Sequence, residues 1–172
     1  MKILVVYSTQ TGNTKTIAEG LASGLGEEAE LFPVAEAPEP AGYDLVVPGF
    51  WVDKGRADKA TLGYLERIRR QKTAFFFTLG AYPDSPRAEG VEKATREALE
   101  KGGNTVLGSF RCQGKVDPEA RERTRRKLPP DHPHVRMTEE RRALLAEAAR
   151  HPDGEDVRRA AEFGAELRGK AG

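Results

Sequence analysis

Hydroxyl and amide side chains gather in the segment Ser8–Thr14, directly after an apolar run and directly before a helical pattern. A turn that opens a helix points several backbone N–H groups outward, and the positive end of the helix dipole favours an anion. Hydroxyl and amide groups add further hydrogen bonds to phosphate oxygens. The chain offers such groups at Ser8, Thr9, Gln10, Thr11, Asn13 and Thr14, with Gly12 closing the turn. The segment therefore predicts a phosphate site that needs no lysine, and a threonine-rich helix cap is the alternative interpretation.

Two common nucleotide-binding loops do not fit this segment. The pattern G-x-x-x-x-G-K-[ST] of nucleotide-hydrolysing loops and the pattern G-x-G-x-x-G of dinucleotide sites are both missing after the first apolar run. The predicted phosphate site is therefore of another kind.

Two aromatic side chains lie in later loops at the same predicted edge of the sheet. Trp51, the only tryptophan, lies in the loop Gly49–Lys59, and Tyr82 lies in the loop Thr78–Pro86. In doubly wound sheets, ligands bind outside the carboxyl ends of the strands. A flat conjugated ligand with a terminal phosphate would use an aromatic ring on either face and backbone groups along its polar rim. The alternative is that both rings are ordinary loop anchors packed on the domain.

Short apolar runs alternate with longer helical patterns along the chain. The predicted strands are Ile3–Tyr7, Ala29–Pro33, Asp44–Pro48, Thr73–Leu79 and Thr105–Arg111. The predicted helices are Thr14–Leu25, Ala57–Arg69, Pro86–Lys101, Thr138–Arg150 and a last helix that Asp153 caps and that continues through Leu167. Nearly all-apolar strands are covered on both faces, which requires crossover helices and a parallel sheet. The fold class is therefore α/β, with a doubly wound, five-stranded parallel sheet and helices on both faces.

The segment from Gln113 to Arg150 is too long for an ordinary connection and is interpreted as an insertion. It contains the basic run "RERTRRK", in which five cationic side chains could guide an acidic protein or an anionic substrate. A solvated helix, with Glu119 and Glu122 as partners of the cations, is the alternative that we favour. Nucleic-acid binding is not expected, because no aromatic residue lies among the basic ones.

Length and composition set further limits. With 172 residues, 38% hydrophobic and 32% charged, the chain suits one domain, residues 1–172 with the insertion at about 113–150. The net charge of +1 demands neither nucleic acid nor an anionic membrane. No apolar segment approaches the roughly 20 residues that span a bilayer, and no signal peptide is expected. Cys112 is the single cysteine, so an internal disulfide is excluded, and a reducing, cytoplasmic location is expected.

The sequence resembles the flavodoxins, which bind FMN non-covalently. The phosphate loop of that family follows T-x-T-G-x-T, and the run from Thr9 to Thr14 matches at every specified position. Trp51 and Tyr82 stand where flavodoxins often carry the aromatics that sandwich the flavin ring. The resemblance covers Met1–Arg111 and the last helix. "GFWVDKG" and "TLGAYPDS" are similar to a branch of flavodoxin-like proteins, some of which accompany bilirubin reductases.

The resemblance implies the strand order 2-1-3-4-5, FMN as cofactor, and redox chemistry performed by the flavin rather than by a catalytic side chain. It implies that the segment Ser8–Thr14 holds the phosphate and that Trp51 and Tyr82 grip the ring. Backbone atoms nearby would face the ring edge. The cofactor-binding residues implied in addition to Ser8–Thr14 are Phe50, Trp51, Val52, Asp53, Gly55, Thr78, Leu79, Gly80 and Tyr82. No catalytic residue and no metal ligand is expected.

Two departures from the family pattern matter. In flavodoxins a glycine peptide in the first aromatic loop turns over easily toward the reduced flavin, whereas here Val52 and Asp53 follow Trp51 and glycine comes only at Gly55. Electron-carrying flavodoxins are usually acidic, whereas this chain is near neutral, so its partner face is expected to differ.

Three hypotheses for function follow. The first is an FMN-binding electron-transfer protein that exchanges electrons with a partner redox enzyme. The second is an FMN-dependent reductase or dehydrogenase that acts directly on a small organic acceptor, a quinone or a tetrapyrrole, in a pocket roofed by the insertion. The third is a module that lost its cofactor and serves as a binding partner, against which the intact threonine loop argues.

Smaller candidates have ordinary interpretations. His132 and His134 lack the further ligands of a metal site. Cys112 is interpreted as a packed apolar group rather than a reactive thiol. Ser85 is interpreted as a helix cap before a proline-started helix, not as a nucleophile.

Overall fold

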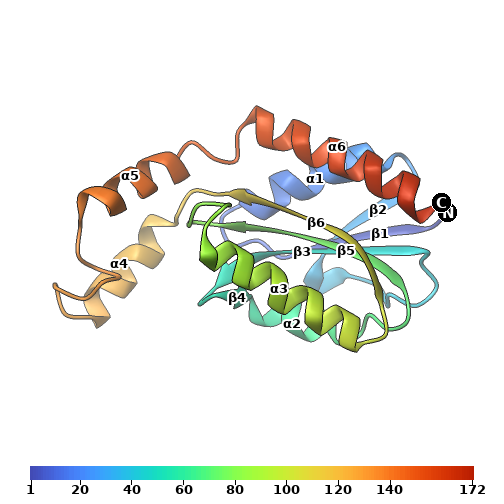
Figure 1. The fold of residues 1–172 in the computed structure, drawn as a ribbon, viewed down its shortest axis with the longest axis horizontal. Coiled ribbons are helices and arrows are strands. Elements are labelled where there is room, and N and C mark those ends of the chain that lie inside the picture. Colours follow the sequence, from blue (N-terminus) through green and yellow to red (C-terminus); the bar gives the residue numbers. More distant parts are fainter.

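The computed structural model describes all residues from Met1 to Gly172 and has a twisted parallel sheet at its centre (Figure 1). Its parallel strands are β1 (Ile3–Tyr7), β2 (Ala29–Pro33), β3 (Leu45–Asp53), β5 (Lys72–Leu79) and β6 (Thr105–Gln113), in the order β2-β1-β3-β5-β6. A two-residue strand, β4 (Arg56–Ala57), pairs antiparallel with β3. The order 2-1-3-4-5 of the five parallel strands is therefore confirmed, and only the label numbers differ, because β4 was not predicted.

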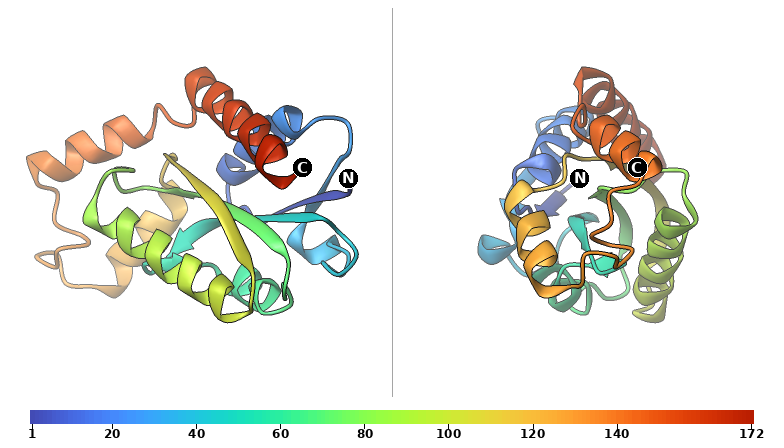
Figure 2. Two further views of the ribbon diagram at one scale, coloured as in Figure 1. Left: turned by 45° about the vertical axis from the view of Figure 1, so that its right-hand side comes forward. Right: turned by 90° about the vertical axis from the view of Figure 1, so that its left-hand side faces the viewer.

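Helices cover both faces of the sheet (Figures 1 and 2). α1 (Asn13–Leu25) and α6 (Gly154–Ala171) lie on one face, and α2 (Lys59–Leu65) and α3 (Pro86–Lys101) lie on the other. A single 3₁₀ turn, η1 (Val34–Glu36), follows β2. The two faces bury separate apolar clusters: Ile3 and Val5 of β1 belong to the cluster under α1 and α6, whereas Leu4 and Val6 belong to the other. This alternation follows from side chains that point to opposite faces along a strand.

Helices α1 and α6 approach each other closely through glycines. A Cβ added at Gly24 of α1 would lie 1.9 Å from the carbonyl oxygen of Ala161, and one added at Gly164 of α6 would lie 2.3 Å from that of Leu21. No side chain fits at either position. The C-terminal half of α1 and the middle of α6 are thus held in close contact.

Strand β3 is longer than predicted. The sequence predicts a strand over Asp44–Pro48 followed by a loop, but β3 continues to Asp53 and Trp51 lies within it, beside Thr78 of β5. The reason is a tight turn: Lys54 has φ 52° and Gly55 has φ 82°, and two positive values in a two-residue loop return the chain antiparallel as β4. The helix predicted over Ala57–Arg69 is correspondingly shorter, because Asp58 caps it and it ends at Leu65.

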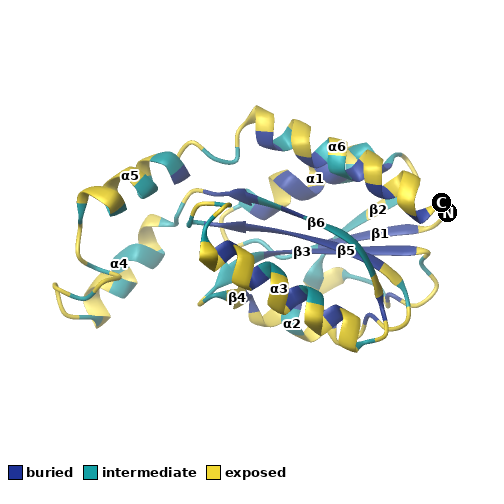
Figure 3. Cartoon of the chain, viewed as in Figure 1, coloured by how far each residue is buried: buried dark blue, intermediate teal, exposed yellow.

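The insertion forms two helices, α4 (Pro118–Lys127) and α5 (Glu139–Ala148), that extend beyond the carboxyl ends of the strands (Figures 1 and 2). Both are largely exposed, in contrast to the sheet (Figure 3). In α4, Glu122 pairs with Arg125 at 2.6 Å and with Arg126 at 3.4 Å. The interpretation of the basic run as a solvated helix is confirmed with Glu122 as a partner of its cations, whereas Glu119, the other expected partner, forms no ion pair. No helix of the chain has both the length and the apolar character that crossing a membrane requires.

Candidate functional site

The N-terminus of α1 differs from those of the other five α-helices. In each of the other five, a capping side chain accepts a hydrogen bond from a backbone N–H of the first turn. The capping residues are Asp58, Ser85, Asp117, Thr138 and Asp153. α1 begins after Gly12, which has φ 96° and no side chain to donate or accept. The first three N–H groups of an α-helix have no acceptor within the helix. In α1 they therefore stay available to a ligand.

Threonine hydroxyls shape the turn before α1. The Gly12 N–H donates to Oγ1 of Thr9 at 2.9 Å, so this hydroxyl keeps its own hydrogen for another acceptor. Oγ1 of Thr14 lies 2.8 Å from Oγ1 of Thr78 in a buried contact, and this hydrogen bond fixes the start of α1 to the end of β5. The turn is thus held by hydrogen bonds between uncharged groups.

Ser8 and Asn13 are partly occupied by protein groups. The hydroxyl of Ser8 donates to Oδ2 of Asp58 at 2.8 Å. A hydroxyl has one hydrogen, so Ser8 does not present a free donor to a ligand, contrary to the expectation from sequence. Nδ2 of Asn13 donates to the carbonyl oxygen of Lys115 at 2.9 Å and keeps its second hydrogen.

A cavity of about 200 Å³ lies against this turn, and we call it the cradle cavity. Ten of the residues predicted from sequence line it: Thr9, Gln10, Thr11, Asn13, Thr14, Trp51, Val52, Thr78, Leu79 and Gly80. The remaining lining residues, Gly114, Lys115, Val116, Asp117 and Ala120, come from the insertion and were not predicted. Their signal was available, because the insertion leaves the carboxyl end of the last strand, which is the edge where ligands of such sheets bind.

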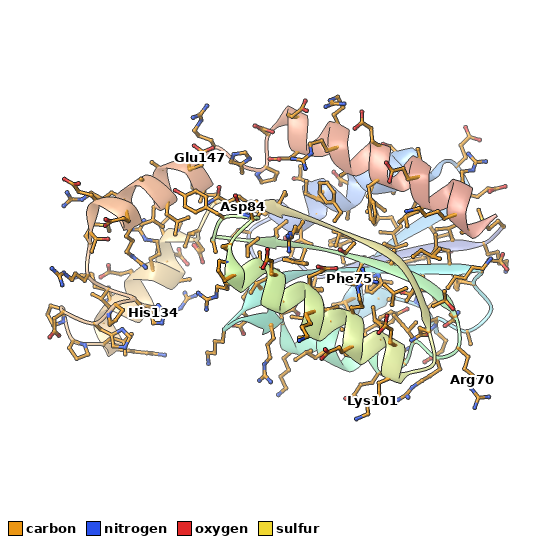
Figure 4. The ribbon with its side chains drawn as sticks, viewed as in Figure 1. Arg70, Phe75, Asp84, Lys101, His134 and Glu147 are labelled. Atoms are coloured by element: carbon orange, nitrogen blue, oxygen red, sulfur yellow. The ribbon has the colours of Figure 1, made fainter.

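A second cavity of about 260 Å³ adjoins the first and shares Val52, Leu79, Gly80 and Val116 with it. We call it the insertion cavity, because α5 closes one side with Leu144 and Leu145. Gly55, another residue that the resemblance assigns to cofactor binding, also lines it. Its charged lining is cationic only, from Lys54, Arg87 and Arg141, and His134 lies beside them. Figure 4 shows His134 in the segment beside α4.

Five further predicted residues lie outside both cavities: Ser8, Gly12, Phe50, Asp53 and Tyr82. Gly12 acts through its backbone at the start of α1. The ring of Phe50 is buried and stacks on Phe77, with ring centroids 5.4 Å apart. Asp53 ends β3, before the turn.

Tyr82 does not face the cavity that Trp51 lines. It is 40% exposed and lines a different cavity, next to Pro83 and Arg111. Val116 of the insertion lies close to the same loop at Gly80, where an added Cβ would lie 2.6 Å from the Val116 side chain. The structure thus does not bring the two predicted aromatics to one cavity.

Cys112 and Ser85 have the predicted structural roles. Cys112 is 2% exposed, and burial raises the pKa of its thiol far above the usual range, which suppresses the reactive thiolate. Oγ of Ser85 accepts a hydrogen bond from the Ala88 N–H at 3.2 Å as the cap of α3.

The arrangement offers a defined binding chemistry. Free N–H groups at a helix start, with the hydroxyls of Thr9 and Thr11 beside them, provide donors for a doubly charged phosphate. The cradle cavity continues past Trp51 into the partly apolar insertion cavity, so a ligand with a phosphate at one end and a flat body at the other fits the two together.

Comparisons with known proteins agree with this geometry. A family model described as "Flavodoxin domain" matches residues 4–165. Two similar proteins are described as "Flavodoxin-like domain-containing protein BilS". That of Clostridioides difficile (strain CD3) is 35% identical and covers 99% of this chain and 98% of the relative. That of Clostridium symbiosum (strain WAL-14163) is 30% identical, with 91% and 90% covered.

The solved structure of oxidised flavodoxin 1 from Bacillus cereus superposes with a TM-score of 0.62, at 19% identity, and covers 97% of each chain. At this identity the likeness concerns the fold, with its parallel sheet and its helices on both faces. The family model and the alignments with the two relatives cover nearly the whole sequence. The chain therefore belongs to the flavodoxin-like, FMN-binding family.

Proposed function

We propose that the protein is an electron-transfer flavoprotein that binds FMN at the cradle cavity and exchanges electrons with a partner redox enzyme. The observation that supports this most directly is the start of α1. It is the one α-helix without a side-chain cap, and it opens into the cavity that Trp51 lines. An unfilled helix start of this kind favours a phosphate.

The residues present fit FMN. The N–H groups of Asn13, Thr14 and Lys15 and the hydroxyls of Thr9 and Thr11 would hold the phosphate. Trp51 would contact one face of the ring, and the backbone from Leu79 to Gly80 would contact its edge. FMN supplies reversible electron transfer when bound, and the chain supplies position and electrostatics.

The chain fixes the peptide that follows Trp51. The carbonyl oxygen of Trp51 accepts a hydrogen bond from the Asp58 N–H at 3.3 Å, and Val52 pairs with Ala57 across the hairpin. A turnover of this peptide would break the hydrogen bond, and no glycine is present to lower its cost. We therefore propose that the backbone here stays fixed through the redox cycle, and that Gly55 serves the turn instead.

Tyr82 would contact FMN only after a movement of its loop. Its ring is exposed and lies outside both cavities. We propose that Trp51 alone provides aromatic contact in the conformation described here, and that Leu79 and Val116 provide the apolar contacts on the other side.

A second candidate function is direct reduction of an organic acceptor. One observation favours it: the insertion places Leu144 and Leu145 over the cavity that adjoins the cradle, so the site is partly roofed. A carrier protein needs an exposed flavin edge, whereas a reductase needs a covered edge with room for its substrate.

We further propose that residues 1–172 form one domain in the cytoplasm. Two core clusters on one sheet support the single domain. The only cysteine is a free, buried thiol, which suits a reducing compartment.

FMN binding is tested by titrating cofactor-free protein with FMN and following flavin fluorescence and visible absorption. Saturable quenching at one FMN per chain is expected. The Trp51→Ala variant should bind about five-fold more weakly or worse, because a stacked aromatic contact contributes about 1 kcal/mol or more. Protein that takes up no FMN would contradict the proposal.

The two functions are separated by turnover measurements on the FMN-loaded protein. After chemical reduction, the protein is mixed with a quinone alone and then with a candidate partner enzyme. Slow reoxidation by the quinone and fast reoxidation by the partner support the carrier. Fast saturable turnover of the quinone without a partner would favour the reductase.

A further inference from the structure

A third cavity, of about 500 Å³, lies at the end of β6 where α5 leads into α6, and we call it the arginine cavity. It shares no lining residue with the cradle cavity or the insertion cavity. The lining residues are Tyr82, Pro83, Arg111, Cys112, Gln113, Ala143, Glu147, His151, Asp156 and Arg159. Figure 4 shows Glu147 at the end of α5 that faces the body of the domain.

Arg111 is the unusual member of this cavity. Its Nη1 is enclosed and has no hydrogen-bond partner, and it is the only buried side-chain nitrogen or oxygen of the chain in that condition. A buried charged donor without an acceptor is strongly unfavourable. Arg111 forms no ion pair, and neither does Arg159, which lines the same cavity. The cavity thus lacks an acceptor for its guanidinium groups.

The two carboxylates of the cavity do not supply that acceptor, because they hold His151. Oδ2 of Asp156 lies 2.6 Å from Nδ1 of His151 and also accepts from the Asp153 N–H at 2.9 Å. Oε1 of Glu147 lies 3.1 Å from Nε2 of the same ring. The two acids and the histidine form a closed hydrogen-bonded group, and the two arginines remain unpaired beside it.

We propose that the arginine cavity binds a small organic monocarboxylate with an apolar or aromatic body. Its carboxylate would accept hydrogen bonds from Arg111 and Arg159, since planar guanidinium and carboxylate groups match in geometry. Its body would lie on Tyr82 and Pro83. The exposed Tyr82, which the cofactor site does not use, thereby has a ligand to contact.

The lining charges favour one negative charge over two. Glu147 and Asp156 lie in the same cavity as the arginines, and each of these carboxylates repels an added anion. The two guanidinium groups and the two carboxylates of the lining largely cancel, so a second negative charge on the ligand gains little attraction but must still be desolvated, and a carboxylate is the better fit. This site does not depend on FMN, because it shares no residue with the proposed cofactor site.

The test uses the full chain and benzoate as the probe, with benzamide as a neutral molecule of the same shape and inorganic phosphate as a dianion. Amide signals of Arg111, Gln113 and His151 are followed by ¹H–¹⁵N NMR. Benzoate is expected to shift these signals saturably, whereas benzamide and phosphate at equal concentration leave them in place. Equal responses to benzoate and benzamide, or a stronger response to phosphate, would overturn the proposal.

Two variants test whether the arginines of the cavity bind benzoate. Arg159→Gln removes an exposed cation that has no partner, so the fold is expected to persist and benzoate affinity to fall at least about ten-fold. The control is Arg168→Gln on the same helix, where the arginine pairs with Glu28 outside the cavity; its affinity should be unchanged. Unchanged benzoate affinity in both Arg159→Gln and Arg111→Gln would overturn the proposal, and if Arg111→Gln does not fold, Arg159→Gln decides alone.

Discussion

The cradle cavity and the arginine cavity offer anions two different kinds of site. The cradle offers backbone N–H groups and hydroxyls that lie within seven consecutive residues, Thr9–Lys15. The arginine cavity uses two guanidinium groups, and its walls come from a loop, a strand and two helices between Tyr82 and Arg159. The comparison teaches that a site built from uncharged local groups can be recognised in a sequence, whereas a site built from distant charges depends on packing.

The two cavities nevertheless depend on the same support. α1 opens at the cradle, and α6, which carries Asp156 and Arg159, opens at the arginine cavity. Gly24 and Gly164 allow these helices to touch along their backbones. A change at this contact should therefore disturb both regions together.

The largest expected effect is that of Gly24→Ala. The new Cβ would lie 1.9 Å from the Ala161 carbonyl oxygen, so the helices must separate, at a cost of about 3 kcal/mol in the free energy of unfolding. Urea denaturation followed by circular dichroism measures this. The matched control is Gly90→Ala in α3, where nothing lies within 4 Å of the new atom; it should stabilise by about 0.5–1 kcal/mol. Equal stabilities of the two variants would contradict the close helix contact.

The next largest effect distinguishes a glycine at the cradle, Gly12, from a glycine elsewhere, Gly42. Gly12 and Gly42 both have φ 96° with nothing within 4 Å of an added Cβ, so an alanine at either should cost about 1–2 kcal/mol of stability through backbone strain. Only Gly12→Ala should also weaken FMN binding, by about ten-fold, because it distorts the start of α1. Flavin fluorescence titration of both variants checks this, and equal FMN affinities would count against the cradle.

A pH-dependent effect characterises the arginine cavity. The hydrogen bond to Asp156 is the main reason why the pKa of His151 is raised above its usual value. The folded state therefore binds the proton more tightly than the unfolded state. This stabilisation is complete below about pH 6.5, the ordinary histidine value, and is lost as pH rises through the raised value.

His151→Gln should accordingly lower the free energy of unfolding more at pH 5.5 than at pH 9. Chemical denaturation at the two pH values measures the difference. The variant is compared with the unaltered protein at each pH, so that the titration of all other groups cancels from the difference. A larger cost of His151→Gln at pH 9 would contradict the linkage.

The smallest effect concerns an arginine that has its partner. Arg125 lies on the exposed face of α4 and pairs with Glu122. The hydrogen bond to Arg125 lowers the pKa of the Glu122 carboxyl, but exposed pairs contribute little to stability. Arg125→Gln should therefore leave the thermal midpoint nearly unchanged, whereas Arg111→Gln should shift it measurably. Scanning calorimetry of both variants compares a solvated arginine with an enclosed one.

Much of the fold follows from the sequence because its signals are local. The strand and helix patterns, the serine cap of α3 and the capping box of α6 all depend on residues a few positions apart. The sequence does not indicate the full length of β3, because its pattern around Lys54 and Gly55 is that of an open loop. A lysine with positive φ is uncommon, so the pair gave only a weak hairpin signal.

At the candidate site, the sequence indicated the cradle residues but not their neighbours. The threonine turn was evident from its spacing, whereas the hydrogen bond from Ser8 to Asp58 crosses 50 residues and that from Asn13 to Lys115 crosses 102. Tyr82 likewise lines a cavity together with residues of α5 and α6 that lie more than 60 positions away in the sequence. Such contacts carry no periodic or motif signal.

The sequence by itself determined the parallel sheet, the threonine-rich turn before α1 and the resemblance to flavodoxins, because each depends on residues close together in the chain. The tertiary structure alone decided that the insertion closes over the cradle, that Tyr82 faces away from Trp51, and that Arg111 is enclosed without a partner. The physical reason is that the burial and charge of these groups depend on which distant segments pack against them.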